Sequence, residues 1–463
     1  MTALASLPSS TGLANVDSEF ALLSAILYES KRVETVVDSL REEHFSEPFF
    51  GRVYGVVARE FSKGNPLNPL TLRPFIEADE AYQAMGAMQF IANLTNSNSL
   101  LVNAKATAAQ IKELARRRDL IAGMREALHM AGDVNETIES VVDAAEAAIV
   151  DAADKSDTIR QPSAAQAMGA LLKAAESPKR SIRSNIIPSM DDLLGGMRPK
   201  QMIIGGGRPG MGKTAAALSY SLGAAQAGHG VLYVSLEMGA EELAARMAAD
   251  LAFNGNSGVL YADINSDNPS RRALQAMYDA QKMLEDMPIH ILDAGGLTLA
   301  QLELRIRRFK RRFAARGISL DLVVVDYLQL LRTDDKRQSS YEAVSEISRR
   351  LKGMAKDYEV AMFALAQLSR GVESRSDKRP QLADLRDSGQ IEQDADAVLF
   401  FYRHAYYLRQ ALPTSDRDPL YASTMAEIEA VEGAIEFICA KRRNGVTGAA
   451  VAEFHGKYQA VRG

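Results

Sequence analysis

Eight residues near the middle of the chain have the types and the spacing that phosphate binding requires. The segment 207–214, GRPGMGKT, fits the pattern G-x-x-x-x-G-K-[ST]. Its glycines let backbone N–H groups approach phosphate oxygens, Lys213 can reach the β- and γ-phosphates, and the Thr214 hydroxyl can ligate Mg²⁺. The segment therefore predicts a site for a nucleoside triphosphate with Mg²⁺. Its members are Gly207, Arg208, Pro209, Gly210, Met211, Gly212, Lys213 and Thr214.

The segments on either side of this loop are of the kind that such a site needs. The apolar run 202–204 is typical of a buried strand, and an alanine-rich stretch typical of a helix begins at Ala215. A helix that starts directly after the loop directs the positive end of its dipole at the bound anion. A glycine-rich turn that matched by chance would need neither neighbour, so both neighbours favour the binding site.

Two further apolar runs end in a carboxylate. The run 322–326 predicts a strand whose last residue, Asp326, holds Mg²⁺ through its water shell; the alternative is an acid that only caps the strand. The run 231–237 ends in Glu237, which can activate the water that attacks the γ-phosphate if its strand lies beside the phosphate loop. The spacing equally allows a surface glutamate, so both interpretations of Glu237 stay open.

An amide ends another strand and precedes a long basic loop. Gln367, at the end of the run 362–367, can hydrogen-bond the γ-phosphate or a water and report the state of the nucleotide to the next loop. That loop, 369–393, carries five cations, which favours contact with nucleic-acid phosphates. The alternative is a solvated loop whose cations pair with neighbouring acids.

Two other basic segments allow more than one interpretation. Residues 441–445, KRRNG, directly follow a buried strand. Because Lys213 already supplies a cation to the loop's own site, the sharper interpretation is that this tip enters the site of a neighbouring subunit; the alternative is an ordinary hairpin turn. The helix expected at 298–315 carries six cations and could contact DNA, solvent or another subunit.

A parallel sheet is needed to bring these residues together. From about residue 182 the sequence alternates apolar strands with amphipathic helices, which predicts an α/β domain with a mostly parallel sheet and helices on both faces. Ligands of such sheets bind at the carboxyl ends of the strands. We expect strands at 202–205, 231–236, 289–293, 321–326, 361–367, 397–402 and 435–440. We expect helices at 214–227, 240–253, 270–285, 298–315 and 340–357.

The preceding residues contain no catalytic constellation. We expect residues 1–16 to be disordered, 17–150 to form a helical packing or assembly domain, 151–181 to be a linker, and 182–463 to form the domain that binds the nucleoside triphosphate. The linker contains a short helix from Ser163 to Ala175, which is marginal alone and so is expected to dock on another surface. The N-terminal helices are expected near 17–27, 33–40, 49–61, 71–93, 102–130 and 131–152.

Composition restricts the class of protein. The 463 residues suffice for two or three domains, and 47% hydrophobic with 24% charged residues is ordinary for a soluble globular chain. Since the net charge is −5, any nucleic-acid contact must be a local basic feature. The single cysteine, Cys439, excludes a disulfide framework and a thiolate zinc cluster. The chain has neither a membrane-spanning apolar run nor a secretory signal, which predicts a cytoplasmic protein without a membrane partner.

Six ordered motifs resemble those of the DnaB family of replicative DNA helicases. They lie at 208–214, 235–238, 326–330, 366–370, 377–380 and 384–396. The segment 21–27 is also similar to the start of the family's N-terminal domain, so the resemblance covers nearly the whole chain from about residue 15. It implies a RecA-like P-loop NTPase motor domain preceded by an all-α N-terminal domain and a docking linker helix.

The resemblance also implies an activity and partners. It implies a homohexameric ring that hydrolyses ATP with Mg²⁺, moves along single-stranded DNA and unwinds forked duplex DNA in the 5′→3′ direction. Primase and a helicase loader are further implied partners. The catalytic residues carried over are Lys213, Glu237 as the water-activating carboxylate, Gln367, and Lys441 and Arg443, which reach the neighbour's nucleotide. Arg246 would lie against the base, and the DNA contacts would be Arg386, Asp387 and Gly389.

The sequence departs from the family's pattern at the loop. The triplet 205–207 is richer in glycine than is usual, and Gly210 stands where serine is frequent. We expect both to loosen the turn without removing a required group. The segment 404–432 varies within the family and is assigned no role.

Three other classes of function share parts of the pattern. A RecA-like strand-exchange or clock-type ATPase assembles on a target without unwinding it, and it leaves the N-terminal helices and the linker helix unexplained. A small-molecule kinase has no use for the basic loop 369–393. A non-catalytic assembly module does not need the intact pair Lys213 and Glu237.

Overall fold

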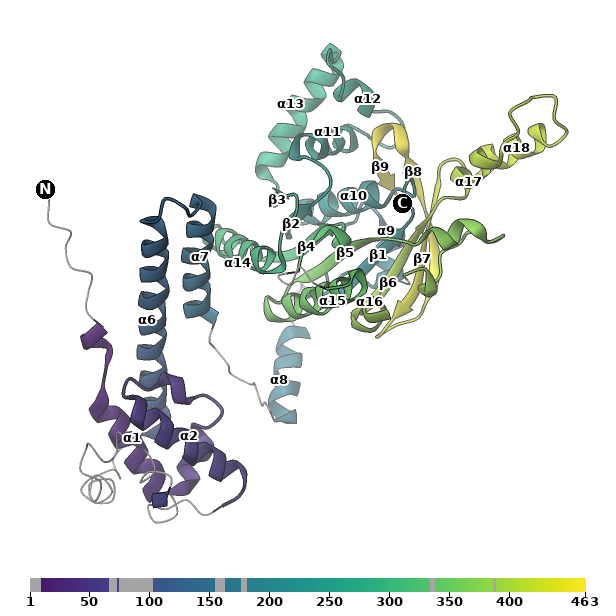
Figure 1. The fold of residues 1–463 in the computed structure, drawn as a ribbon. Coiled ribbons are helices and arrows are strands. Elements are labelled where there is room, and N and C mark those ends of the chain that lie inside the picture. Colours follow the sequence, from purple (N-terminus) through teal and green to yellow (C-terminus); the bar gives the residue numbers. More distant parts are fainter. Residues whose placement is uncertain are drawn as a thin grey trace, which may run out of the picture. The chain divides into compact units, whose positions relative to one another are not determined.

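The computed structural model describes residues 10–65, 73–74, 103–154, 163–175, 181–333, 338–385 and 389–463. The chain forms two compact units, Met1–Met168 and Gly169–Gly463 (Figure 1). The division falls inside α8 (Ala164–Ala175), the helix expected within the linker. Ser163 caps this helix, because its hydroxyl accepts a hydrogen bond from the Gln166 N–H at 3.2 Å.

The N-terminal unit is helical in its described part. Its helices are α1 (Val16–Tyr28), α2 (Pro48–Ser62), α6 (Ala104–Ala131) and α7 (Ile138–Asp154). Helix α1 begins where the Asn15 side chain accepts a hydrogen bond from the Ser18 N–H. Leucines of α1, aromatic residues of α2 and alanines of α6 pack in one apolar cluster. Amphipathic spacing therefore brings these helices together through a shared core.

Three expectations for this unit are wrong in detail. The helix expected at 131–152 begins only at Ile138, because residues 132–137 form turns after α6. Residues 33–40 were expected to form a helix, but the structure has a 3₁₀ helix at Ser30–Thr35 followed by turns, which still bury Val33, Val36 and Leu40. Ser10–Leu13, expected to be disordered, forms a 3₁₀ turn because Arg118 of α6 donates to the Leu13 carbonyl at 3.0 Å. The helix expected at 71–93 lies outside the described residues except at 73–74.

A nine-stranded sheet forms the centre of the C-terminal unit, with the order β3-β2-β4-β5-β1-β6-β7-β8-β9. The strands from β3 to β6 in this order pair in parallel, and β6 to β9 pair antiparallel. All seven expected strands are present, and β8 and β9 are additions. Their bounds are β1 (Met202–Gly207), β2 (Gly230–Ser235), β3 (Ile289–Asp293), β4 (Leu320–Asp326), β5 (Ala361–Gln367), β6 (Ala397–Tyr402), β7 (Ala434–Arg442), β8 (Gly448–His455) and β9 (Ala460–Arg462).

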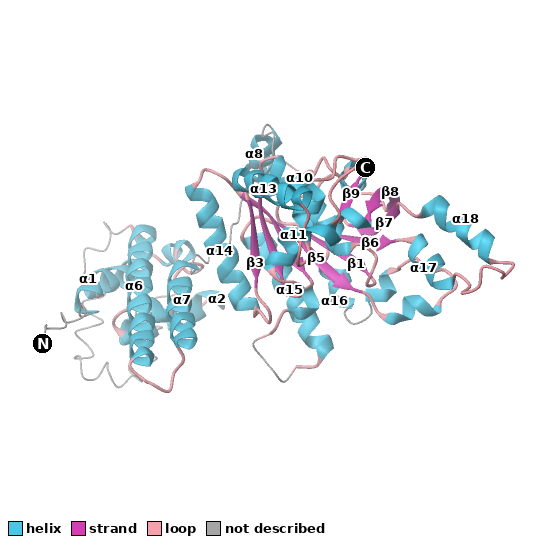
Figure 2. Cartoon of the chain, turned by 90° about the horizontal axis from the view of Figure 1, so that it is seen from above, coloured by secondary structure: helices cyan, strands magenta, loops and turns pink. Residues whose placement is uncertain are grey.

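Helices cover both faces of the sheet, as expected (Figure 2). One face packs against α9 (Pro188–Leu194), α10 (Lys213–Gln226) and α11 (Ala240–Leu251). The other packs against α14 (Leu299–Ala315), α15 (Ser340–Asp357) and α16 (Gly389–Asp394). The unit also contains α12 (Tyr261–Ile264), α13 (Arg271–Asp286), α17 (His404–Ala411) and α18 (Tyr421–Val431).

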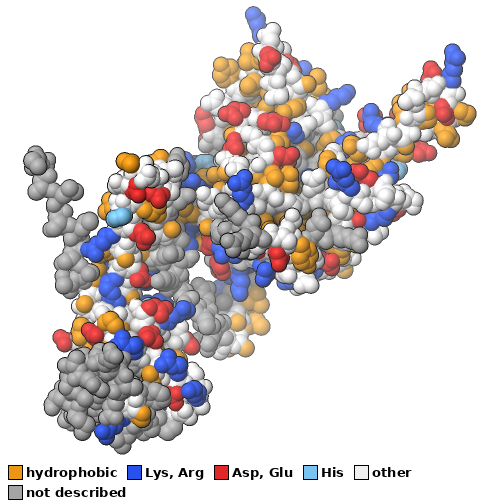
Figure 3. Space-filling view, in the orientation of Figure 1, with side chains coloured by type: hydrophobic (Ala, Val, Ile, Leu, Met, Phe, Trp, Pro, Cys, Tyr) orange, Lys and Arg blue, Asp and Glu red, His pale blue; other side chains and the backbone are white. Residues whose placement is uncertain are grey.

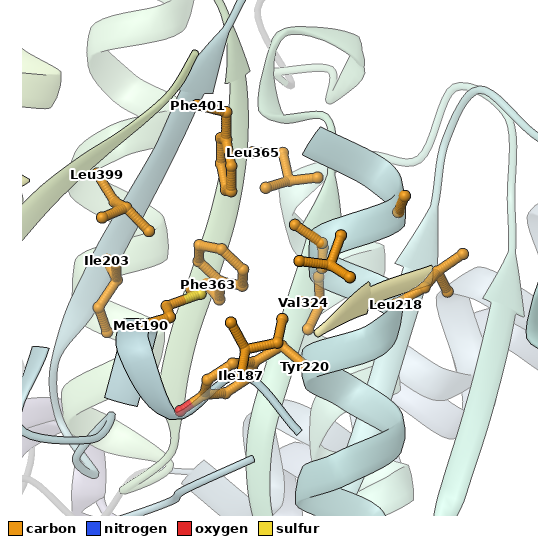
Figure 4. Close-up of a cluster of buried hydrophobic side chains, with 14 of the residues drawn as sticks. Ile187, Met190, Ile203, Leu218, Tyr220, Val324, Phe363, Leu365, Leu399 and Phe401 are labelled. Carbon is orange, nitrogen blue, oxygen red and sulfur yellow. The ribbon is translucent and has the colours of Figure 1, made fainter. Parts of the chain in front are cut away.

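Alternation along the strands produces the two cores. In β5, Phe363 and Leu365 belong to the cluster on the α10 side, whereas Met362 and Ala364 belong to the cluster on the α15 side. Figure 4 shows Phe363 and Leu365 with Tyr220 of α10 in the first cluster. Because both faces are buried, the strands are continuous apolar runs, which made them visible in the sequence.

The surface of the C-terminal unit is mixed in charge. Figure 3 shows Lys and Arg side chains interspersed with Asp and Glu side chains on one face. The hairpin of α17 and α18 extends away from the sheet (Figure 1). None of the helices that the structure describes combines the length and the apolar content needed to cross a membrane.

Candidate active site at the strand ends

The carboxyl ends of β1, β2, β4 and β5 meet at one cavity of about 800 Å³. Glu237 follows β2, Asp326 ends β4, Gln367 ends β5, and the phosphate loop follows β1, so all four contribute to its lining. Two strands, β4 and β5, lie between β2 and β1. We expected Glu237 to serve only if its strand lay beside the phosphate loop, and β2 does not lie beside β1. The Glu237 side chain nevertheless reaches the same cavity.

The phosphate loop has the backbone that its glycines predict. Gly210 and Gly212 have φ values of 79° and 81°, a left-handed conformation that side chains disfavour. A Cβ at Gly210 would also lie 2.6 Å from the ring of Tyr406. Glycine at 210 is thus favoured by conformation and by the close approach of Tyr406 in α17, whereas the sequence suggested a loosened turn. Helix α10 begins at Lys213, so its N-terminal end faces the loop.

Lys213 is held against the loop that carries it. Its ammonium group donates to the carbonyl oxygens of Gly207 at 2.7 Å and Arg208 at 3.2 Å. Burial lowers the pKa of Lys213 from 10.5 to about 8, although the charges of Asp326 and Glu237 raise it. Lys213 therefore holds its proton less tightly than an ordinary lysine does. An incoming phosphate would stabilise the charged form.

Asp326 and Thr214 present oxygen atoms on the same side of the cavity. Asp326 is buried, and its carboxylate accepts hydrogen bonds from the Tyr233 hydroxyl at 2.9 Å and from the Thr214 hydroxyl. Burial raises the pKa of Asp326 in spite of these bonds and of Lys213. The Lys213 and Asp326 shifts both favour the neutral forms, so burial outweighs the attraction between the two groups.

This pair of oxygens fits a magnesium ion. Mg²⁺ prefers oxygen ligands and keeps several waters, so one carboxylate and one hydroxyl suffice beside the oxygens of a bound phosphate. Groups of three or more His, Cys, Asp or Glu residues suited to a metal do not occur among the described residues. A dedicated protein cage for a metal is thus absent from the described part of the chain, whereas a phosphate-dependent magnesium site remains compatible with it.

Gln367 combines a fixed backbone with an exposed side chain at the cavity. The Gln329 amide donates to the Gln367 carbonyl at 3.0 Å and accepts from its N–H at 3.3 Å. Glu237 is likewise exposed at the cavity, so water can reach its carboxylate. Both side chains can therefore approach a bound γ-phosphate without rearrangement of the sheet.

Arg246 of α11 lines the cavity together with Glu242 of the same helix. It donates to the side chains of Gln459 at 2.6 Å and Glu242 at 3.0 Å, and it lies 5.2 Å from the ring centroid of Tyr261. Its Nε atom is buried and has no hydrogen-bond partner among the described residues. A planar cation with an unsatisfied donor suits stacking against a base or contact with a phosphate.

The residues that line the cavity and that sequence reasoning missed include Arg403, Phe454 and Gln459. Arg403 donates to the Gly210 carbonyl at 3.0 Å and lies 3.9 Å from the ring centroid of Phe454. It directly follows β6, so the strand-end rule could have identified it. Phe454 and Gln459 come from β8 and from the turn before β9, and no local motif marks either.

The basic tip 441–445 was expected to follow a strand directly, but its first two residues are the last two of β7. It does not line the cavity of its own chain. Lys441 donates to the Glu392 carbonyl, and Arg443 donates to the Gln393 carbonyl and lies 3.6 Å from the Asp396 carboxylate. Among the DNA-contact candidates, Gly389 is exposed at the start of α16. Arg386 and Asp387 lie outside the described residues.

Several cations of the basic segments bind groups of their own chain. Arg375 pairs with Asp384, which supports the solvated-loop alternative for this residue of 369–393. Arg379 pairs instead with Glu436 of β7, an acid outside the loop. In α14, Arg307 is buried and donates to the Tyr358 hydroxyl at 2.8 Å. Part of each basic segment is therefore structural.

Two family models match the chain. The DnaB-like helicase C terminal domain matches residues 183–462, and the DnaB-like helicase N terminal domain matches residues 12–113. Together they cover the ATPase sheet, the cavity and the described helices α1 and α2.

Curated relatives and solved structures agree with these models. The chain is 32% identical over 453 residues to the replicative DNA helicase DnaB of Rickettsia conorii, covering 94% of this chain and 90% of that protein. It is 30% identical over 461 residues to the replicative DNA helicase DnaC of Bacillus subtilis, covering 96% and 93%. A DnaB-like replicative helicase whose structure was solved to study its interactions with primase is 25% identical, with a TM-score of 0.68 and coverage of 97% and 99%.

Proposed function

The chain belongs to the DnaB family of replicative DNA helicases, and on this premise we propose that its cavity hydrolyses ATP to unwind DNA at a replication fork. The observation that carries the proposal is the convergence of Lys213, Thr214, Asp326 and Glu237 on one cavity from separate strand ends. These are the groups that phosphate binding, magnesium coordination and activation of water require.

The residues divide the work of hydrolysis among them. Backbone N–H groups of 207–214 and the Lys213 ammonium hold the β- and γ-phosphates, and Arg246 lies against the base. Thr214 and Asp326 would hold Mg²⁺, which would neutralise part of the negative charge of the phosphates. Glu237 orients and polarises the water that attacks the γ-phosphate, because its carboxylate is exposed at the cavity.

The remaining groups belong to an assembly. The protein acts as a homohexameric ring in which Lys441 and Arg443 reach the nucleotide of the neighbouring subunit. This arrangement is supported by the position of both side chains beside α16 rather than at their own cavity. Helix α8, whose Met168 and Leu172 are 55% and 59% exposed, docks on a neighbouring surface.

The proposed DNA contacts follow the reporting amide in the chain. Gln367 senses the γ-phosphate, and Arg386, Asp387 and Gly389 bind the phosphates of single-stranded DNA in the central channel. Contact with phosphates gives binding independent of sequence, which 5′→3′ translocation requires. Primase and a helicase loader are further proposed partners in the cytoplasm, and primase is supported by the relative whose structure was solved to study its interactions with primase.

Assays of ATP hydrolysis and strand displacement on the purified full chain test this function. We expect single-stranded DNA to stimulate hydrolysis, a forked duplex with a free 5′ tail to be unwound, and sizing to give a hexamer. Lys213→Ala should abolish hydrolysis and unwinding together. Hydrolysis stimulated by DNA without strand displacement would instead indicate a strand-exchange ATPase, and phosphoryl transfer to a small molecule would indicate a kinase.

A further inference from the structure

Arg208 links the phosphate loop to the segment that follows β5. Its guanidinium is buried, 8% of the residue being exposed. One nitrogen, Nη1, donates to the Leu368 carbonyl at 2.8 Å, and Nε donates to the Glu373 carboxylate at 2.8 Å. Because both donors belong to one rigid plane, a displacement of Arg208 must move both acceptors or break a bond.

The acceptors belong to a segment that is tied together internally. Glu373 lies in the 3₁₀ helix Arg370–Ser374, and the adjacent Arg375 donates to both carboxylate oxygens of Asp384 at 2.9 and 2.7 Å. The Ser369 N–H donates to the Asp384 carbonyl at 3.1 Å. Asp384 is 6% exposed, so its two bonds to Arg375 are held in a buried setting. The segment 368–385 therefore has the contacts of a single body.

We propose that Arg208 is a positioning residue that transmits movement of the phosphate loop to the segment 368–385 and so couples nucleotide state to DNA grip. The proposal rests on the proposed function, in which the residues that follow this segment contact DNA. It defines a connection separate from Gln367, whose backbone is held by Gln329 of a different strand end.

The same two strands provide a matched control. Lys200 precedes β1 and Glu359 precedes β5, and their side chains form an ion pair at 2.7 Å. This pair joins β1 to β5 at the amino ends of the strands, whereas Arg208 and Glu373 join them beyond the carboxyl ends. Loss of either carboxylate removes one ion pair between the same strands, but only the pair of Arg208 and Glu373 includes a residue of the phosphate loop.

The test compares Glu373→Gln with Glu359→Gln in the full-length protein. The readout is the ratio of dissociation constants for a fluorescent single-stranded oligonucleotide with ADP and with a non-hydrolysable ATP analogue. We expect Glu373→Gln to reduce this ratio about two- to fivefold, the range of a partly exposed ion pair. Hydrolysis without DNA should stay unchanged, because Glu373 does not line the cavity. Glu359→Gln should leave both quantities unchanged.

Two further variants separate positioning from simple folding. Glu373→Asp retains the charge, so its ratio of dissociation constants should lie between those of Glu373→Gln and wild type. Arg208→Lys retains the charge but lacks the two-donor guanidinium, so its ratio should fall as in Glu373→Gln. A ratio for Glu373→Gln equal to that of Glu359→Gln would overturn the inference alone. A wild-type protein whose DNA affinity and hydrolysis do not respond to one another would overturn the proposed function, and the inference with it.

Discussion

At the scale of single residues, the buried Lys213 gives the site a dependence on pH. Burial lowers the pKa of Lys213 to about 8, so in the free protein the cation that must meet the phosphates is lost as pH rises through that value. We expect kcat/KM for ATP to fall above about pH 8, since kcat/KM reports groups of the free enzyme. Steady-state hydrolysis from about pH 6.5 to about 9.5 measures the limb.

Cys439 provides the control for this limb. Its thiol is buried, which raises its pKa, so it should not titrate in the same range. Cys439→Ala should therefore leave the alkaline limb in place. A profile that stays level up to about pH 9.5, as for a lysine with the ordinary pKa of about 10.4, would contradict the assignment.

Glu237 is the residue whose role most needs a direct test. We expect Glu237→Gln to lower kcat about 10²- to 10⁴-fold with little change in KM, because the amide cannot accept a proton from the attacking water. Glu241 of α11 is also exposed and close in sequence but does not line the cavity. Glu241→Gln should keep wild-type kcat, and an equal loss in both variants would show that Glu237 acts through surface charge.

The sequence reveals chemistry that is carried by a local pattern. Lys213 and Asp326 belong to a motif or end an apolar run, so their place at a ligand site follows from a few neighbouring residues. Gln459 reaches the cavity only because β8 and β9 return antiparallel beside β7, an arrangement with no signature near residue 459. Glu237 shows the same limit, because strand order cannot be obtained from the strand itself.

At the scale of elements, the second half of β1 consists of three glycines, which leave room for the side chains of neighbouring strands. A Cβ at Gly205 would lie 2.7 Å from Leu365 and 2.9 Å from both Phe363 and Phe401. We expect Gly205→Ala to destabilise the protein by about 1–3 kcal/mol, because overpacking forces these side chains out of their rotamers. Chemical denaturation followed by circular dichroism measures the change.

Gly353 of α15 is the matched control for this substitution. No heavy atom lies within 4 Å of the Cβ that Gly353→Ala would add. Alanine should therefore stabilise the helix by about 0.5–1 kcal/mol. Equal effects at the two positions would contradict a steric role for Gly205. The sequence suggested that the glycines 205–207 loosen the turn, whereas the side chains around Gly205 require a glycine within the strand.

Elements with two buried faces were predictable, and half-exposed ones were not. Strand β6 is the apolar run 397–402 and was expected with its observed bounds. Strand β8 has the sequence GAAVAEFH, in which alanine and glycine give little strand preference and only one residue is buried. The segment 33–40 has helical spacing over too few residues for an α-helix, so packing decides its form.

At the scale of the whole molecule, one chain does not bring all the proposed catalytic groups together. Lys213 and Glu237 line one cavity, whereas Arg443 lies beside α16 and outside that cavity. A head-to-tail ring would let each copy complete the site of the next, since heterologous contacts close into rings. Assembly is then a condition of turnover rather than a consequence of it.

Mixed rings give this idea a decisive test. Arg443→Ala and Lys213→Ala should each abolish hydrolysis while hexamers persist in sizing. An Arg443→Ala subunit still has an intact phosphate loop, and a Lys213→Ala subunit still has an intact basic tip. If Arg443 acts on the neighbour, an interface that joins this loop to this tip is complete. Random mixing in equal amounts should then restore activity at about a quarter of the interfaces of a heterologous ring.

The two assignments of Arg443 predict opposite results for the mixture. If Arg443 served its own cavity, every subunit would lack one required group and the mixture would stay as inactive as its parts. Subunits must exchange for the test to operate, so the variants are mixed under dissociating conditions and reassembled, and rings of Lys213→Ala with wild type verify exchange. Activity that appears only in the mixture would place a catalytic group in trans, because neither parent contains a complete site.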